Sequence, residues 1–126
     1  MLELSDCPCA GNTLDRLIQP AILVILVTGP LHGYRVAEQI QERLSPGDQK
    51  PDMSGVYRSL KAMERKGLVA SSWEHAHAGP ARKCYEITPD GERCLAQWIE
   101  TIERYRDGIN DLLRAARSAV RKRAET

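Results

Sequence analysis

The sequence has no apolar run long enough to cross a membrane. Its longest such run, AILVILV, extends only from Ala21 to Val27, whereas a membrane-spanning helix needs about 20 apolar residues. Acidic residues precede the run, which does not fit the charge pattern of a secretion signal. We therefore expect a cytoplasmic protein with no membrane partner.

The sequence also lacks the residue patterns of common catalytic sites. It contains no Gly-rich phosphate-binding loop, no HExxH motif and no recognisable Ser/His/Asp set. The acidic residues of its first half have no evident catalytic partner. We therefore expect that the protein is not an enzyme and needs no cofactor.

Cysteine is scarce, with four residues in the chain: Cys7, Cys9, Cys84 and Cys94. Without a secretion signal, a disulfide framework is not expected. The simplest interpretation makes Cys84 and Cys94 small buried apolar residues. The alternative is a thiol or metal sensor that uses Cys7 and Cys9, although metal sites more often use Cys-x-x-Cys spacing.

The formal net charge of +1 conceals two basic blocks. Residues 50–83 carry seven Lys/Arg against three Asp/Glu, and residues 114–126 carry five against one. The two remaining segments, 1–49 and 84–113, are acidic. A polyanion responds to the local charge, so the near-neutral total does not exclude nucleic acid as a partner.

The length of 126 residues suits one domain with an appended element. Residues 1–11 have no periodicity and are predicted to form an irregular arm. A short helix follows, with Asn12 or Thr13 as its cap, and Pro20 suits the first turn of a second helix, PAILVILVTG. A buried strand is the alternative for this second segment, but its Gly-Pro ending favours a helix.

The next helix, HGYRVAEQIQERL, is amphipathic, with His32 as a turn or cap residue. Its apolar residues recur at helical spacing along one face: Gly33, Val36, Ala37, Ile40 and Leu44.

A further helix is predicted from about Asp52 to Lys66, with Gly67 as its left-handed cap. Its apolar face contains Val56, Leu60 and Met63. The opposite face carries a stripe composed of Ser54, Arg58, Lys61 and Arg65. A charged helix face is usually only a solvated surface, so the neighbouring elements must decide its role.

Two short alternating segments, LVASSWEH and RKCYEIT, predict a β-hairpin after Gly67. Thr88-Pro89-Asp90 then starts a long helix. This helix carries a heptad seam, with apolar residues at alternating spacings of three and four: Leu95, Trp98, Ile102, Tyr105, Ile109, Leu112, Ala116 and Ala119. Such a seam favours pairing with a second helix. Gly108 weakens the helix that carries the seam by about 1 kcal/mol relative to Ala.

The order of helices followed by a hairpin predicts a mainly α fold with a small β-hairpin, a winged helix-turn-helix. In this fold the third helix enters the DNA major groove and the hairpin, or wing, touches the DNA backbone. The predicted DNA-contacting residues are Ser54, Tyr57, Arg58, Lys61, Arg65, Arg82 and Lys83. The predicted dimer interface contains Leu95, Trp98, Ile102, Tyr105, Ile109 and Leu112.

Three segments resemble the PadR family of transcriptional regulators: GPLHGYRVAEQI, PDMSGVYRSLKAMERKGLVASSW and GPARKCYEITPDGERCL. The resemblance covers roughly Leu14 to Leu95 and continues into the last helix. It implies a homodimeric winged-helix repressor that leaves its operator DNA when an effector binds. Ser54 and Cys84 depart from the resemblance, since the family often has Gly and an aromatic residue at these positions.

The expected organisation is an arm at 1–11, a DNA-binding domain at 12–88 and a dimerisation helix at 89–126. Trp98, Cys7 and Cys9 are the candidates for sensing an effector or a redox change. His75 and His77 share a strand face and could join Cys84 around a metal ion, but wing histidines are more often solvated, so we assign no metal ligands. The alternative functions are a protein-interaction adaptor and a thiol- or metal-responsive DNA-binding sensor.

Overall fold

The computed structural model describes residues 14–44, 53–74 and 79–126. The chain divides into two compact units at the peptide bond between Leu95 and Ala96. The first unit contains three α-helices, a small sheet and the start of the last helix, and the second contains the remainder of that helix. The predicted arm, the caps Asn12 and Thr13, and the residues Cys7, Cys9, His75 and His77 lie outside the described ranges.

Helix α1 (Ile18–Val27) is the central element of the first unit. A 3-10 helix, η2 (Leu14–Leu17), leads directly into it, and α1 begins two residues before Pro20. Pro20 lies in the first turn of α1, as predicted, where its missing N–H breaks no hydrogen bond. The segment AILVILV is therefore helical, and the alternative of a buried strand is excluded.

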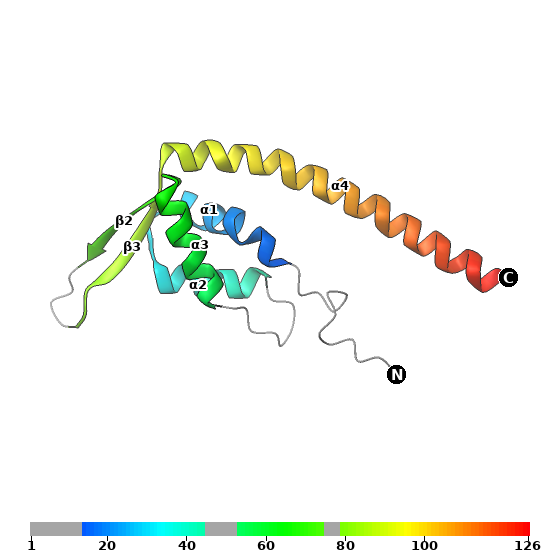
Figure 1. The fold of residues 1–126 in the computed structure, drawn as a ribbon, viewed down its shortest axis with the longest axis horizontal. Coiled ribbons are helices and arrows are strands. Elements are labelled where there is room, and N and C mark those ends of the chain that lie inside the picture. Colours follow the sequence, from blue (N-terminus) through cyan, green and yellow to red (C-terminus); the bar gives the residue numbers. More distant parts are fainter. Residues whose placement is uncertain (1–13, 45–52, 75–78) are drawn as a thin grey trace. The chain divides into compact units, whose positions relative to one another are not determined.

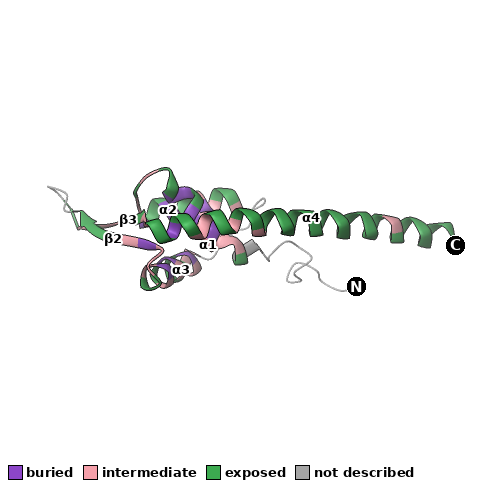
Figure 2. Ribbon diagram, turned by 90° about the horizontal axis from the view of Figure 1, so that it is seen from above, coloured by how far each residue is buried: buried purple, intermediate pink, exposed green. Residues whose placement is uncertain are grey.

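The core forms where α1 meets α2 (Gly33–Leu44), α3 (Met53–Arg65) and strand β3 (Arg82–Ile87). Because α1 contacts elements on several sides, it is apolar nearly all round, whereas α2 and α3 are amphipathic. Figure 2 shows buried residues on all three helices. The largest fully buried side chains are Pro20, Ile22, Leu23, Leu26, Val36, Ile40, Val56, Leu60, Met63 and Val69.

The predicted hairpin is confirmed as β2 (Val69–Glu74) paired antiparallel with β3. Figure 1 shows it extending away from the helices of the first unit. A third strand, β1 (Leu31–His32), pairs with the other edge of β3, which gives the order β1-β3-β2. His32 is therefore a strand residue, which the sequence did not predict, and it also directly precedes the first residue of α2, where a helix cap lies. Two residues are too few for an alternating pattern to reveal a strand.

Gly67 ends α3 as predicted and turns the chain into β2. Its φ of +80° lies in the left-handed region, which favours glycine because it has no Cβ. The Gly67 N–H donates to the Glu64 carbonyl at 3.0 Å, and the Leu68 N–H donates to the Met63 carbonyl at 2.9 Å. This pair of hydrogen bonds is a Schellman motif, which satisfies carbonyls at the helix end.

Helix α4 (Pro89–Glu125) begins at the predicted Thr88 cap. The Thr88 Oγ1 accepts a hydrogen bond from the Gly91 N–H at 3.0 Å and donates one to the Gly67 carbonyl at 2.6 Å. The cap therefore also joins the start of α4 to the end of α3. Within the described residues, no helix is both long and apolar enough to cross a membrane.

Candidate nucleic-acid interface

Helix α3 separates its two faces as the sequence predicts. Val56, Leu60 and Met63 are completely buried, so this face of the helix is fixed against the core. The predicted contact residues on the opposite side are all exposed: Ser54, Tyr57, Arg58, Lys61 and Arg65. The helix thus presents a basic surface that a rigid core supports from behind.

Tyr57 lies at the edge of this surface and is partly anchored. Its side chain is 40% exposed, and its Cε1 would lie 3.6 Å from a Cβ built on Gly33. Tyr85 would be closer still to that Cβ, at 3.2 Å. The absence of a side chain at Gly33 therefore lets two tyrosine rings approach the start of α2, and part of the Tyr57 ring remains open to a partner.

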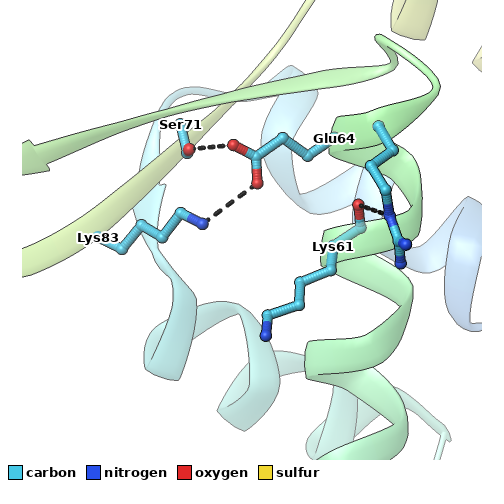
Figure 3. A network of polar contacts seen from close by, with 5 residues as sticks. Lys61, Glu64, Ser71 and Lys83 are labelled. Atoms are coloured by element: carbon cyan, nitrogen blue, oxygen red, sulfur yellow. Dashed lines mark hydrogen bonds and ion pairs between the residues drawn. The ribbon is translucent and has the colours of Figure 1, made fainter.

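A cluster of three polar side chains joins the hairpin to α3 (Figure 3). The Lys83 Nζ in β3 lies 3.2 Å from the Glu64 Oε2 in α3, and the Ser71 hydroxyl in β2 donates to the other Glu64 oxygen. Glu64 and Lys83 are each about one-third exposed, at 33% and 29% of their side chains. We call Glu64, Ser71 and Lys83 the wing-base cluster.

The charges of the wing-base cluster stabilise each other. The hydrogen bond from Ser71 and then the interaction with Lys83 lower the pKa of Glu64, while burial opposes this shift. The hydrogen bond to Glu64 is the main reason that the pKa of Lys83 is raised. Both groups are therefore ionised at neutral pH. Lys83, predicted as a DNA contact, is already engaged with α3 in the free protein.

Arg82 connects the hairpin to helix α2. Its guanidinium donates a hydrogen bond to the Tyr34 hydroxyl at 3.3 Å and lies 5.6 Å from the centre of the Tyr34 ring. Residues alternate between the faces of a strand, so Arg82 and Lys83 project from opposite sides of β3. The two basic side chains of the wing therefore attach it to two different helices.

The arrangement is an exposed basic helix beside a β-hairpin whose base is attached to the helices, which is the geometry of a winged helix-turn-helix. An α-helix of this kind fits the major groove of B-DNA. A family model described as the transcriptional regulator PadR-like family matches residues 22–97. The chain belongs to this PadR-like family. The resemblance predicted from the sequence motifs is thereby confirmed.

Solved structures of PadR-like and other regulators are similar to this chain. A PadR family regulator from Clostridium difficile is 28% identical, with a TM-score of 0.67, and the match covers 77% of this chain and 98% of that one. A transcriptional regulator from Thermoplasma acidophilum is 31% identical, with a TM-score of 0.69 and coverages of 79% and 93%.

The third similar structure is Bacillus subtilis PadR in complex with operator DNA. It is 26% identical, with a TM-score of 0.58, and the match covers 67% of this chain and 47% of that one. No curated protein matches the chain.

The predicted seam of the PadR-like chain lies on α4. Its middle and distal apolar residues are exposed, and the exposed fraction reaches 70% at Leu112. Three further exposed apolar residues, Ile99, Leu113 and Val120, recur at multiples of seven and lie next to the seam. They widen the apolar stripe beyond the two positions per heptad of a simple coiled coil, as in helices that pack into bundles.

Cys84 and Cys94 are both free thiols of intermediate burial. Their predicted role as small buried residues is therefore met only in part. Burial, followed by the charges of Glu74 and Glu86, raises the pKa of Cys84, which keeps this thiol protonated at neutral pH.

Sequence reasoning missed the residues that hold the wing: Glu64, Ser71 and Tyr34. Each is part of a contact between elements that are 7 to 48 residues apart in the chain. Neither periodicity nor a local motif signals such a contact. The strand register, which pairs Ser71 with Tyr85 and Trp73 with Lys83, brings Ser71 and Lys83 to the same face of the hairpin.

Proposed function

We propose that this protein is a dimeric, sequence-specific DNA-binding repressor that acts in the cytoplasm. The observation that carries the proposal is the exposed basic face of α3 beside the attached wing. Arg58 and Lys61 occupy the middle of this face, where an inserted helix comes closest to base edges and phosphates. The complex of Bacillus subtilis PadR with operator DNA supports DNA as the partner.

The proposed contacts comprise Ser54, Tyr57, Arg58, Lys61 and Arg65 of α3 with Arg82 and Lys83 of the wing. In a two-fold dimer, two copies of α3 would enter half-sites about one helical turn apart, or a small multiple of that spacing. Release by a small-molecule effector also belongs to the proposal. It rests on family membership, with Trp98 as the candidate aromatic residue on α4.

The test compares binding to the DNA that flanks the protein's own gene. We expect Arg58→Ala and Lys61→Ala each to weaken binding by about 1–3 kcal/mol. Loss of a phosphate contact should also lower the slope of log affinity against log salt by about one. Fluorescence anisotropy at several salt concentrations measures both quantities.

Lys66→Ala is the matched control, since Lys66 is exposed and has the same charge but follows the last residue of α3. The affinity of the Lys66→Ala variant for DNA should stay within about twofold of that of the parent protein, because Lys66 lies outside the basic stripe of α3. Unchanged affinity in both Arg58→Ala and Lys61→Ala would refute the proposal. Equal binding of unrelated DNA at matched salt would instead favour the protein-adaptor alternative.

A further inference from the structure

The outer face of the small sheet brings together three side chains with metal-binding atoms. His32 in β1 lies directly opposite Cys84 in β3, and Cys84 lies opposite Ser72 in β2. Glu74 is two residues beyond Ser72, so it projects from the same face. This face is opposite to the one that carries Ser71 and Lys83, and the site is therefore separate from the wing-base cluster.

The three side chains already converge. The His32 Nε2 and the Glu74 Oε2 are 2.7 Å apart, and one ligand atom from each of His32, Glu74 and Cys84 lies within 4.8 Å of the others. In a tetrahedral zinc site the ligand atoms are about 3.3–3.6 Å apart, given the usual metal–ligand bond lengths. Small side-chain rotations bridge the difference, and Glu74, whose side chain is 60% exposed, has room for them.

We propose that His32, Glu74 and Cys84 form a binding site for a divalent transition metal ion of the zinc type. Imidazole nitrogen, thiolate sulfur and carboxylate oxygen together suit Zn²⁺ and Co²⁺, whereas Mg²⁺ and Ca²⁺ prefer oxygen ligands alone. On binding, Cys84 becomes a thiolate and its proton passes to solvent. The fourth position of the tetrahedron is filled by water.

A bound ion would connect all three strands of the sheet. His32 is adjacent to the start of α2, and Glu74 is the last residue of β2 before the hairpin tip. The ion would therefore add a link between the wing and α2, beside the one that Arg82 makes to Tyr34. This role goes beyond DNA binding and does not depend on it.

The test titrates the full-length, metal-free protein with Co²⁺ alone and then displaces the ion with Zn²⁺. One Co²⁺ per chain should bind with a thiolate-to-cobalt charge-transfer absorption. Cys84→Ser should abolish this absorption, and His32→Gln and Glu74→Gln should each weaken binding roughly tenfold or more. Cys94→Ser is the matched control and should retain the full absorption, since Cys94 is the other described free thiol.

Two further variants separate this site from the other candidate ligands in the sequence. Cys7→Ser with Cys9→Ser, and His75→Gln with His77→Gln, should both keep the charge-transfer absorption. Loss of the absorption in either double variant, or its persistence in Cys84→Ser, would overturn the proposal.

Alkylation provides a measurement that needs no cysteine variant. Equimolar Zn²⁺ should slow iodoacetamide modification of Cys84 but not of Cys94, as read by mass spectrometry of the peptides. In His32→Gln this protection should disappear. Equal protection of both thiols, or none in the parent protein, would also overturn the proposal.

Discussion

Glu64 is the residue on which the attachment of the wing to helix α3 depends, because it binds Ser71 and Lys83 at the same time. Its pKa is lowered in the folded chain, so it contributes stability above its ordinary pKa of about 4.5. This contribution is lost as the pH falls through the folded-state value. Lys83 has a raised pKa, so its contribution is present below about 10.5 and is lost only above that value.

We therefore expect Glu64→Gln to lower the free energy of unfolding by about 1 kcal/mol at pH 7. This loss of stability is modest because the side chains of Glu64 and Lys83 are both partly exposed, and solvent screens their attraction. The difference from the parent protein should shrink as the pH falls below 4.5. Urea unfolding of both proteins at pH 7 and at about pH 3.5–4 measures this difference in the free energy of unfolding. Glu103→Gln, at an exposed position on α4, is the control, and an equal loss there would contradict the role given to Glu64.

At the scale of the elements, the start of α4 requires a glycine. A Cβ at Gly91 would overlap the Leu68 carbonyl oxygen and would lie 2.7 Å from the Ile87 Cγ1. Gly91 is buried, and its N–H donates to the Thr88 cap. The helix can approach the end of the hairpin this closely only because no side chain intervenes.

The same substitution at two glycines of α4 should have opposite effects. Gly91→Ala should destabilise the protein by about 2–3 kcal/mol, since backbone and core atoms must move to relieve the overlap. A Cβ at Gly108 meets no described atom within 4 Å, so Gly108→Ala should stabilise the helix by up to about 1 kcal/mol. Thermal unfolding of both variants measures the effects, and a Gly91→Ala protein as stable as the parent would contradict the packing argument.

The elements also show how far the sequence could predict the fold. Helices α2, α3 and α4 were predicted from apolar spacing and from their caps, because these signals are local. Strand β1 was missed, because pairing with Tyr85 and Cys84 defines it and two residues carry no period. The same strand register brings His32 and Glu74 close to Cys84. Because this register was not predicted, the sequence analysis considered His75 and His77 as partners of Cys84 and missed this cluster.

At the scale of the whole molecule, the exposed apolar stripe on α4 indicates a protein interface. Ile109 and Leu112 are 64% and 70% exposed, and together with Ile102, Tyr105 and Val120 they leave a long apolar surface in water. Contiguous surfaces of this kind commonly mark protein interfaces. A second copy of the chain would cover the stripe by pairing equivalent surfaces about a two-fold axis.

We expect Ile109→Asp to convert the proposed dimer to a monomer or to weaken dimerisation at least roughly a hundredfold, because the buried carboxylate would have no partner. Asn110→Asp adds the same charge at the adjacent residue, off the seam, and should leave the dimer intact. Sedimentation velocity over a range of concentrations distinguishes these results. A monomeric parent protein, or equal weakening in both variants, would contradict the assignment of the seam.

The sequence by itself determined the helical elements, the hairpin, the basic face of α3 and the family, because helical spacing, turn residues and local motifs are properties of neighbouring residues. Tertiary structure alone decided that Glu64 and Tyr34 hold the wing, that Gly91 must be glycine, and that His32, Glu74 and Cys84 meet. These features join residues far apart in the chain, and their contacts exist only once the strands pair and the helices pack. The spacing of residues along the chain does not predict which residues of different strands pair.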